Sequence, residues 1–325
     1  MKLRQLATAF LAAAGLLAAN LAAAQGYPNR PIKLIVPWTP AGTVDIAARH
    51  LAERLAVRLG QAMVVENRAG ATGQVGSTAV VQAAPDGYTL LAMSATVHTF
   101  SPNLSKKFPF DPIDDFAVVS QIVSFPYAMV VPANSRFKTV ADVAAFAKAN
   151  PGKLSYASFG LGSGPYMVSE LFAQSARVEF LHVPYKGAAP AIIDLLSGQV
   201  DFFIDSLPSP LAQVRAGKLR ALAVTTPRRS NFLPEVPAMA ETIPGFDASV
   251  WLGIAASPKT PREIVDRLNT EIRAISVEPA YVERLRNVGL EAVASASPDE
   301  FRAFLVAQKK YWGDFVQKAK IPLSD

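Results

Sequence analysis

Two uncharged, glycine-containing loops are the parts of this sequence whose residue types are best suited to bind a ligand. Residues 38–43 are Trp-Thr-Pro-Ala-Gly-Thr, and residues 158–164 are Ser-Phe-Gly-Leu-Gly-Ser-Gly. Neither loop contains Lys or Arg, so an anion bound there must be held by backbone N–H groups, hydroxyl groups and water. Such donors suit a carboxylate at the positive ends of two helices. The alternative interpretation is that both loops are structural turns.

The candidate ligand-binding residues come from these loops and from the ends of two further predicted strands. Ser94 and Thr96 follow a predicted strand at residues 88–93, and Asp205 ends a predicted strand at residues 200–205. Trp38 is either a core residue or a wall of the site, and its position in a loop favours the wall. The complete set expected to line the site is Trp38, Thr39, Ala41, Gly42, Thr43, Ser94, Thr96, Ser158, Gly160, Gly162, Ser163, Gly164 and Asp205.

Three residues near the loops have more specific expected roles. Gly42 and Gly162 are interpreted as positions of positive φ or close approach, so a Cβ at either is expected to obstruct the ligand. Asp45 lies in the first turn of the helix that follows the first loop, four residues before Arg49. That spacing favours a structural role for Asp45, with ligand contact as the alternative.

Catalytic and metal-binding chemistry has little support in the sequence. The chain has no cysteine, which excludes a thiol nucleophile and thiolate metal ligands. Its three histidines, His50, His98 and His182, form no His-x-x-x-His pair, so we expect no metal, no cofactor and no catalytic residue. Ser163 is the nearest candidate for a hydrolase nucleophile, but it lacks the Gly-x-Ser-x-Gly pattern. His98 is expected in a polar loop, either at the surface or against a ligand.

The first loop is expected to connect a strand to a helix. Residues 32–36 form a short apolar run with β-branched members, which is typical of a buried strand. Pro37 and Pro40 then exclude regular structure for a few residues. From residue 43 onwards, apolar residues recur at helical spacing as far as residue 59. The loop therefore lies where helix N–H groups without partners bind ligands in open α/β sheets.

Strands and helices continue to alternate along the chain, which predicts two α/β units. We expect a two-lobed α/β fold in which each lobe is a mainly parallel sheet flanked by helices. The second unit is inserted in the first, and the crossings are expected near residues 124–126 and 249–251. The predicted division is residues 25–124 plus 250–325 for lobe 1 and residues 125–249 for lobe 2.

Residues 1–24 have the pattern of a cleaved secretory signal peptide. Lys2 and Arg4 precede an Ala- and Leu-rich apolar segment, and three alanines precede Gln25. A retained membrane anchor is the alternative. Removing the signal lowers the formal charge by two, from +6 to +4, and most of the remaining basic residues are scattered. No nucleic-acid-binding face is therefore expected.

Several motifs resemble the substrate-binding proteins of tripartite tricarboxylate transporters, the Bug or TctC type. They follow the order of that family through the mature chain, at residues 36–49, 65–70, 84–91, 110–112, 156–158, 182–187, 217–224 and 233–237. Two positions depart from the family pattern. Ala41 stands where the family usually has glycine, and Pro165-Tyr166 stands where many members have Thr or Ser followed two residues later by His. Both differences lie in the expected ligand mouth.

The resemblance implies a periplasmic solute-binding protein with a type II-like periplasmic binding protein fold. Its expected ligand is a small organic acid: a mono-, di- or tricarboxylate or a carboxylated aromatic. The two loops would hold the carboxylate, partly through ordered water. The expected partners are the membrane subunits of a tripartite tricarboxylate transporter, and the protein itself is expected to be a monomer in the periplasm.

Two alternatives belong to other functional classes. One is an exported α/β hydrolase, for which burst turnover of an activated ester, lost in Ser163→Ala, would be evidence. The other is a ligand sensor that passes its signal to a membrane receptor. The sequence does not separate sensing from transport.

Overall fold

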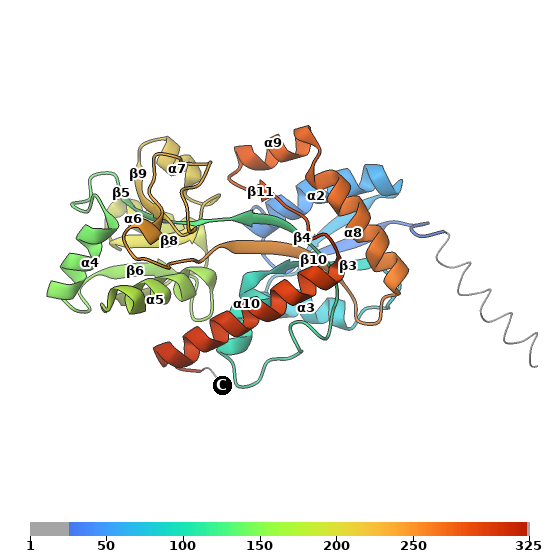
Figure 1. Cartoon of the computed structure of the whole chain (residues 1–325), viewed down its shortest axis with the longest axis horizontal. Helices are drawn as coiled ribbons and strands as arrows, with labels where there is room; N and C mark the ends of the chain where they lie inside the picture. Colours follow the sequence, from blue (N-terminus) through green and yellow to red (C-terminus); the bar gives the residue numbers. More distant parts are fainter. Residues whose placement is uncertain (1–25, 324–325) are drawn as a thin grey trace, which may run out of the picture.

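The computed structural model describes residues 26–323, in which the strands form two sheets with helices packed on them (Figure 1). The signal-peptide prediction lies outside the described residues. One sheet has six strands in the order β11-β4-β10-β3-β1-β2. Its strands are β1 (Ile32–Val36), β2 (Met63–Asn67), β3 (Thr89–Ser94), β4 (Ala117–Phe125), β10 (Val250–Ala256) and β11 (Glu291–Ala292). This sheet is the centre of the first lobe.

The other sheet has five strands in the order β7-β6-β8-β5-β9 and is the centre of the second lobe. Its strands are β5 (Tyr127–Pro132), β6 (Ser155–Ser158), β7 (Leu181–Pro184), β8 (Phe202–Ser206) and β9 (Leu219–Val224). The chain leaves the first sheet at Phe125 and enters the second at Tyr127, and it returns to the first sheet at Val250.

The α-helices of the two lobes follow the strand–helix rhythm of the sequence. Those of the first lobe are α2 (Thr43–Leu59), α3 (Gln74–Val81), α8 (Arg262–Ser276), α9 (Pro279–Asn287) and α10 (Pro298–Ala319). Those of the second lobe are α4 (Val140–Ala149), α5 (Gly164–Ala176), α6 (Ala188–Ser197) and α7 (Leu211–Arg215). Among the described residues, the structure contains no helix that is long and apolar enough to cross a membrane.

The sheets are mixed, which corrects the prediction of mainly parallel sheets. β1 is parallel to β2 and β3, and β6 is parallel to β7 and β8. In contrast, β10 is antiparallel to β3 and β4, and β5 is antiparallel to β8 and β9. The physical reason is the insertion of one unit in the other. Because the chain leaves the first sheet through β4 and returns through β10, these neighbours run in opposite directions.

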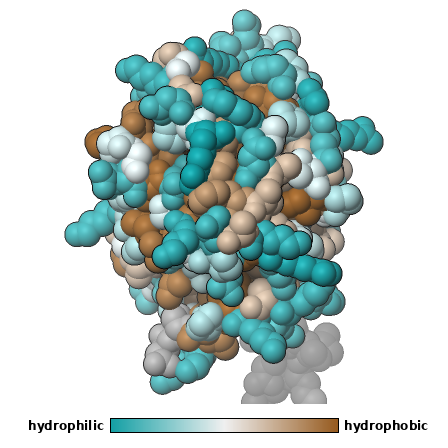
Figure 2. Space-filling model, turned by 90° about the vertical axis from the view of Figure 1, so that its left-hand side faces the viewer, coloured by the Kyte–Doolittle hydropathy of each residue, from teal (hydrophilic) through white to brown (hydrophobic). Residues whose placement is uncertain are grey.

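The two lobes lie side by side along the long axis of the molecule, with β4 and β10 running between them (Figure 1). Large aromatic side chains fill the first lobe, where Trp251 packs edge-on against Phe301 and Phe100 packs edge-on against Trp312. These contacts attach α10 to strand β10 and to the turn that follows β3. Figure 2 shows the opposite end of the molecule, at the second lobe, where hydrophobic patches alternate with hydrophilic ones.

The segment after β3 differs from its prediction as a polar loop. Residues Thr96–Phe100 form a π-helical turn, and Ser101–Asn103 form a 3-10 turn directly after it. Val97, His98 and Phe100 are buried there. A buried loop would leave backbone N–H and C=O groups without hydrogen bonds. The helical turns pair these groups within the segment, so the segment can be buried.

Candidate functional site

Asp45 organises the first loop, residues 38–43. Its Oδ2 accepts hydrogen bonds from the Ala41 N–H and from Arg49 Nε, each at 2.9 Å, and its Oδ1 accepts one from Asn67 Nδ2 at 2.8 Å. Burial raises the pKa of the Asp45 carboxyl, but these hydrogen bonds outweigh it and the net shift is downward. The structural role predicted for Asp45 is confirmed by these contacts. Asn67, at the end of β2, also donates to the Trp38 carbonyl oxygen.

In the first loop, the residue with positive φ is Ala41 and not Gly42, which was expected to have it. Ala41 has φ 65°, in the left-handed region, whereas Gly42 has φ −78° and ψ 166°, which any residue adopts. A Cβ on Gly42 would meet only the Thr39 carbonyl oxygen, at 3.6 Å. The prediction that Gly42 is needed for positive φ or close approach is therefore wrong. Ala41, and not Gly42, has the backbone conformation that favours glycine.

The N-terminus of α2 is open. Gly42 is its N-cap and supplies no side-chain hydrogen bond. Within residues 26–323, the N–H groups of Gly42, Thr43 and Val44 donate no hydrogen bond. These donors carry the partial positive charge of a 17-residue helix. They are available to an anion or to water.

Of the other site residues expected at the ends of β1 and β3, only Trp38 and Ser94 contact each other. Trp38 Nε1 donates to Ser94 Oγ at 3.4 Å, so these two residues lie side by side at the ends of their strands. Trp38 is half-buried and packs against the core, so it is part core and part loop wall. Thr39 is exposed and Thr96 is half-buried, and neither side chain has a hydrogen-bond partner in the described range.

The second loop, residues 158–164, satisfies most of its own donors. Ser163 is the N-cap of α5, and its Oγ accepts from the N–H groups of Phe159 and Tyr166 while donating to the Gly160 carbonyl at 2.7 Å. The Gly160 N–H donates to Ser158 Oγ at 2.9 Å. Within the described chain, the N–H groups of Leu161, Gly162 and Gly164 remain without a partner.

Three glycines of this loop cannot carry a side chain without strain, and Gly160 is one of them because its φ is 95°. Gly162 has φ 76°, and a Cβ there would lie 3.3 Å from Ser101 Oγ, across the boundary between the lobes. A Cβ on Gly164 would lie 1.7 Å from the hydroxyl oxygen of Tyr127. Tyr127 is buried, so its ring has little freedom to move away. The expectation of close approach is confirmed for Gly162.

Ser158 is held by a histidine that the sequence analysis did not assign to the site. Ser158 Oγ and His182 Nε2 are 2.5 Å apart. The His182 ring is stacked on Tyr156 and tilted against Tyr166, and burial lowers the pKa of His182. Tyr166 is one of the departures from the family pattern. The chain motif that contains His182 was visible in the sequence, but its pairing with Ser158 depends on the register of β6 and β7.

The two lobes touch at both loops. Thr43 Oγ1 lies 3.2 Å from Ser206 Oγ at the end of β8, and Ser101 Oγ donates to the Gly162 carbonyl at 3.4 Å. Ser206 and Ser101 were not among the predicted site residues. Ser206 directly follows Asp205, so its position was within reach of the sequence. Ser101 was not, because it lies beyond the polar loop predicted at residues 94–98 and its contact depends on how the two lobes pack. Within residues 26–323, no hydrogen bond joins the two loops to each other.

Asp205 is a buried acid next to this contact. Its Oδ1 accepts from the Ser206 N–H at 2.8 Å, and the side chain is almost fully buried. Burial raises the pKa of Asp205 to about 6, and the hydrogen bonds that lower it do so only partly. A carboxyl with this pKa is mostly ionised at neutral pH and becomes neutral in mild acid.

His98 lies in the core and not at the surface or in a ligand mouth, so both expectations for it are wrong. It is fully buried in the π-helical turn, with its Nδ1 3.1 Å from the Ser94 carbonyl oxygen and its ring against Phe116. Burial lowers the pKa of His98 to about 4. The ring is therefore neutral at physiological pH, and Nδ1 carries the proton because its partner is an acceptor.

Comparison with known proteins identifies relatives over nearly the whole chain. The family described as tripartite tricarboxylate transporter family receptor, TctC, matches residues 47–321. Protein BugT of Bordetella pertussis is 37% identical over 311 residues, which cover 95% of this chain and 94% of BugT.

Two solved structures with bound acids are also similar. An R. palustris protein with adipate has a TM-score of 0.86 and 34% identity, over 92% of this chain and 100% of that one. MatC from Rhodopseudomonas palustris with bound malate has a TM-score of 0.81 and 28% identity, over 89% of this chain and 100% of MatC.

Proposed function

This chain belongs to the tripartite tricarboxylate transporter receptor family, and from that premise we propose that it captures a small carboxylate between its two lobes. The observation that carries the proposal is the pair of uncharged loops with unpaired N–H groups. Gly42, Thr43 and Val44 supply them in the first lobe, and Leu161, Gly162 and Gly164 in the second. Six donors without a protein partner, three in each lobe, suit an oxyanion or the waters around it.

The ligand class follows from the relatives with bound acids. Adipate and malate are both dicarboxylates, and the proteins that hold them share the fold and more than a quarter of the residues with this chain. We therefore propose a dicarboxylate or a monocarboxylate as the ligand, ahead of a tricarboxylate or a carboxylated aromatic. Thr39, Thr43, Ser94 and Thr96 would contact the rest of the ligand, directly or through water, and Asp205, which is mostly ionised at neutral pH, would accept a hydrogen bond from a ligand hydroxyl group or from water.

The chain is proposed to bind without catalysis. The hydrolase alternative requires a free nucleophile at Ser163, but the Ser163 hydroxyl is almost fully buried and serves as the N-cap of α5. Ser158 lies beside His182, yet its oxygen also accepts the Gly160 N–H and is completely buried. Neither serine is placed to attack a substrate.

Location, partners and lobe boundaries belong to the same proposal. The receptor works in the periplasm as a monomer, after cleavage before or near Gln25, and delivers its ligand to the membrane subunits of a tripartite tricarboxylate transporter. Lobe 1 consists of residues 25–124 and 250–325, and lobe 2 of residues 125–249. A sensor that signals to a membrane receptor would use the same cleft.

A thermal-shift screen with adipate, malate, citrate and benzoate tests the ligand class. A ligand at about 100 times its dissociation constant adds roughly 2.7 kcal/mol to the free energy of unfolding. We expect a dicarboxylate to give the largest rise in Tm. If no acid raises Tm and the protein hydrolyses an activated ester, the binding proposal is wrong and the hydrolase alternative replaces it.

A further inference from the structure

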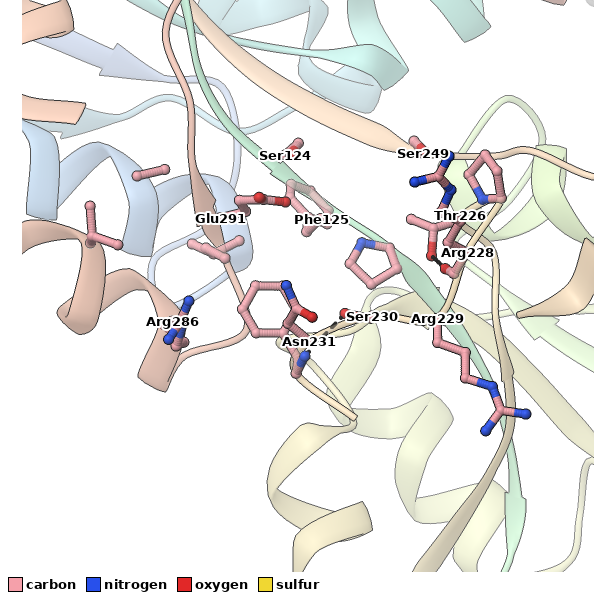
Figure 3. A pocket seen from close by; sticks show the side chains of 16 residues that line it. Ser124, Phe125, Thr226, Arg228, Arg229, Ser230, Asn231, Ser249, Arg286 and Glu291 are labelled. Atoms are coloured by element: carbon pink, nitrogen blue, oxygen red, sulfur yellow. Dashed lines mark hydrogen bonds between the residues drawn. The ribbon is translucent and has the colours of Figure 1, made fainter. Parts of the chain in front are cut away.

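We propose that a second small-molecule site lies beside the hinge, the place where the chain crosses between the lobes at residues 124–126 and 249–251, in a pocket that binds an anion with two or more negative charges. The pocket has a volume of about 590 Å³ and is lined by residues of both lobes. Figure 3 shows Arg286 and Glu291 on one side of the strand that carries Ser124 and Phe125, and Arg228 on the other. Small-molecule sites commonly have volumes of about 300–1,000 Å³.

This pocket is separate from the cleft proposed above. None of the thirteen residues expected from the sequence to bind the carboxylate lines it. Its walls come from α9, β11, the end of β4 and the chain that follows β9, and β11 and β9 are edge strands of the two sheets. The cleft loops instead follow β1 in one sheet and β6 in the other. In the first sheet, β4, β10 and β3 lie between β11 and β1.

The charge of the lining favours an anion. Three arginines line the pocket, and Arg229 is held by two hydrogen bonds of 2.9 Å to Glu241. Arg228 and Arg286 have no ion pair within residues 26–323, and Glu291 is the only acid among the lining residues of this range. Two guanidinium groups without an ion pair, set against one carboxylate, give the pocket an excess of positive charge that suits an anion with more than one negative charge.

Neutral groups of the pocket add hydrogen-bonding capacity. Ser124 and Asn231 line it, and neither side chain has a hydrogen-bond partner in the part of the chain that the structure describes. The amide of Asn231 has two donor hydrogens, and the hydroxyl of Ser124 has one. Because Arg228 and Arg286 belong to different lobes, a bound anion would bridge the lobes beside the hinge.

Calorimetric titration of the full mature protein with inorganic pyrophosphate tests this site. Pyrophosphate carries several charges but no carboxylate, so it distinguishes the hinge pocket from a carboxylate cleft. We expect saturable binding to one site, with an affinity that falls steeply as NaCl is added, since the arginines are exposed to solvent. Arg228→Ala and Arg286→Ala should each weaken binding by at least about tenfold.

Arg273→Ala is the matched control, because Arg273 is an exposed arginine of α8 without an ion pair in the described residues and it does not line the pocket. It removes the same charge and should leave the affinity within about twofold of wild type. Gly162→Val, which obstructs the cleft, should also leave pyrophosphate binding unchanged. Urea unfolding of each variant shows whether it is folded.

Three results would overturn the proposal. The site would be excluded if about 10 mM pyrophosphate gave neither heat nor a rise in Tm. A dissociation constant above that concentration would be too weak for an anion held by two arginines. Equal losses in Arg273→Ala and Arg286→Ala would mean a general charge effect. Loss of binding in Gly162→Val with retention in both pocket variants would place the anion in the cleft.

Discussion

The two loops proposed to hold the ligand are similar in composition but differ in how their backbone N–H groups are satisfied. In the first loop, Asp45 reaches back to the Ala41 N–H, and the helix that follows has no side-chain cap. In the second loop, Ser163 caps the helix and binds three backbone groups of its own loop and helix turn. The first loop is therefore open to a ligand at its helix N-terminus, whereas the second is a closed turn with a few donors left over.

This difference predicts unequal tolerance to change. The second loop is packed against buried side chains of both lobes, since Gly164 lies against Tyr127 and Gly162 against Ser101. The first loop has space around Gly42 but holds Ala41 in a left-handed conformation. Packing should therefore limit substitutions in the second loop, and backbone conformation should limit them in the first.

The largest expected effect separates Gly164→Ala from Gly42→Ala. The new Cβ at residue 164 would lie 1.7 Å from the Tyr127 hydroxyl oxygen, so we expect a loss of about 3 kcal/mol or more in the free energy of unfolding. At residue 42 the nearest atom is 3.6 Å away, and the loss should stay below about 1 kcal/mol. Urea unfolding of both variants measures the difference. Equal losses would mean that the two loops are equally packed.

A second prediction compares one buried titratable group in each lobe. Burial raises the pKa of Asp205 from 3.8 to about 6, so its contribution to stability is complete below pH 3.8 and is lost as the pH rises through 6. Burial lowers the pKa of His98 from 6.5 to about 4, so its contribution is complete above pH 6.5 and is lost as the pH falls towards 4.

Variants at these positions should therefore show opposite pH trends. As the pH rises from 4 to 7, the free energy of unfolding of Asp205→Asn should increase by about 2–3 kcal/mol relative to wild type. Over the same range, that of His98→Gln should decrease by a similar amount relative to wild type. Urea midpoints measured across this range provide the test. If the stability difference between each variant and wild type did not change with pH, the pKa shifts attributed to burial of the two groups would be contradicted.

The parts of the fold and of the candidate site that depend on local pattern could be predicted from the sequence. The apolar run at residues 32–36 and the helical spacing from residue 43 to residue 59 predicted a strand and a helix, and both are present as β1 and α2. The parts that depend on tertiary packing could not be predicted. His98 is buried only because the π-helical turn packs under Phe116, and Ser206 meets Thr43 only because two lobes close on each other.

The smallest expected effect concerns Ala41. Alanine in the left-handed region costs roughly 1–2 kcal/mol, and glycine there avoids this cost but loses more chain entropy on folding. Ala41→Gly should therefore stabilise the protein by about 0.5–1 kcal/mol. Thermal unfolding detects this as a rise in Tm, with Gly42→Ala as the neighbouring control. A lower Tm for Ala41→Gly would contradict the claim that the left-handed backbone at Ala41 is strained.

The central claim is that a carboxylate is held between the lobes against the second loop, and calorimetric titration of Gly162→Val with the best acid of the screen tests it most directly. Gly198→Val is the matched control, because Gly198 has φ 78° against 76° at Gly162 and open space around its Cβ position. We predict that Gly162→Val binds more than about tenfold more weakly than wild type, which is 1.4 kcal/mol, while Gly198→Val binds normally. Unchanged affinity in a folded Gly162→Val protein would contradict the account and place the ligand elsewhere.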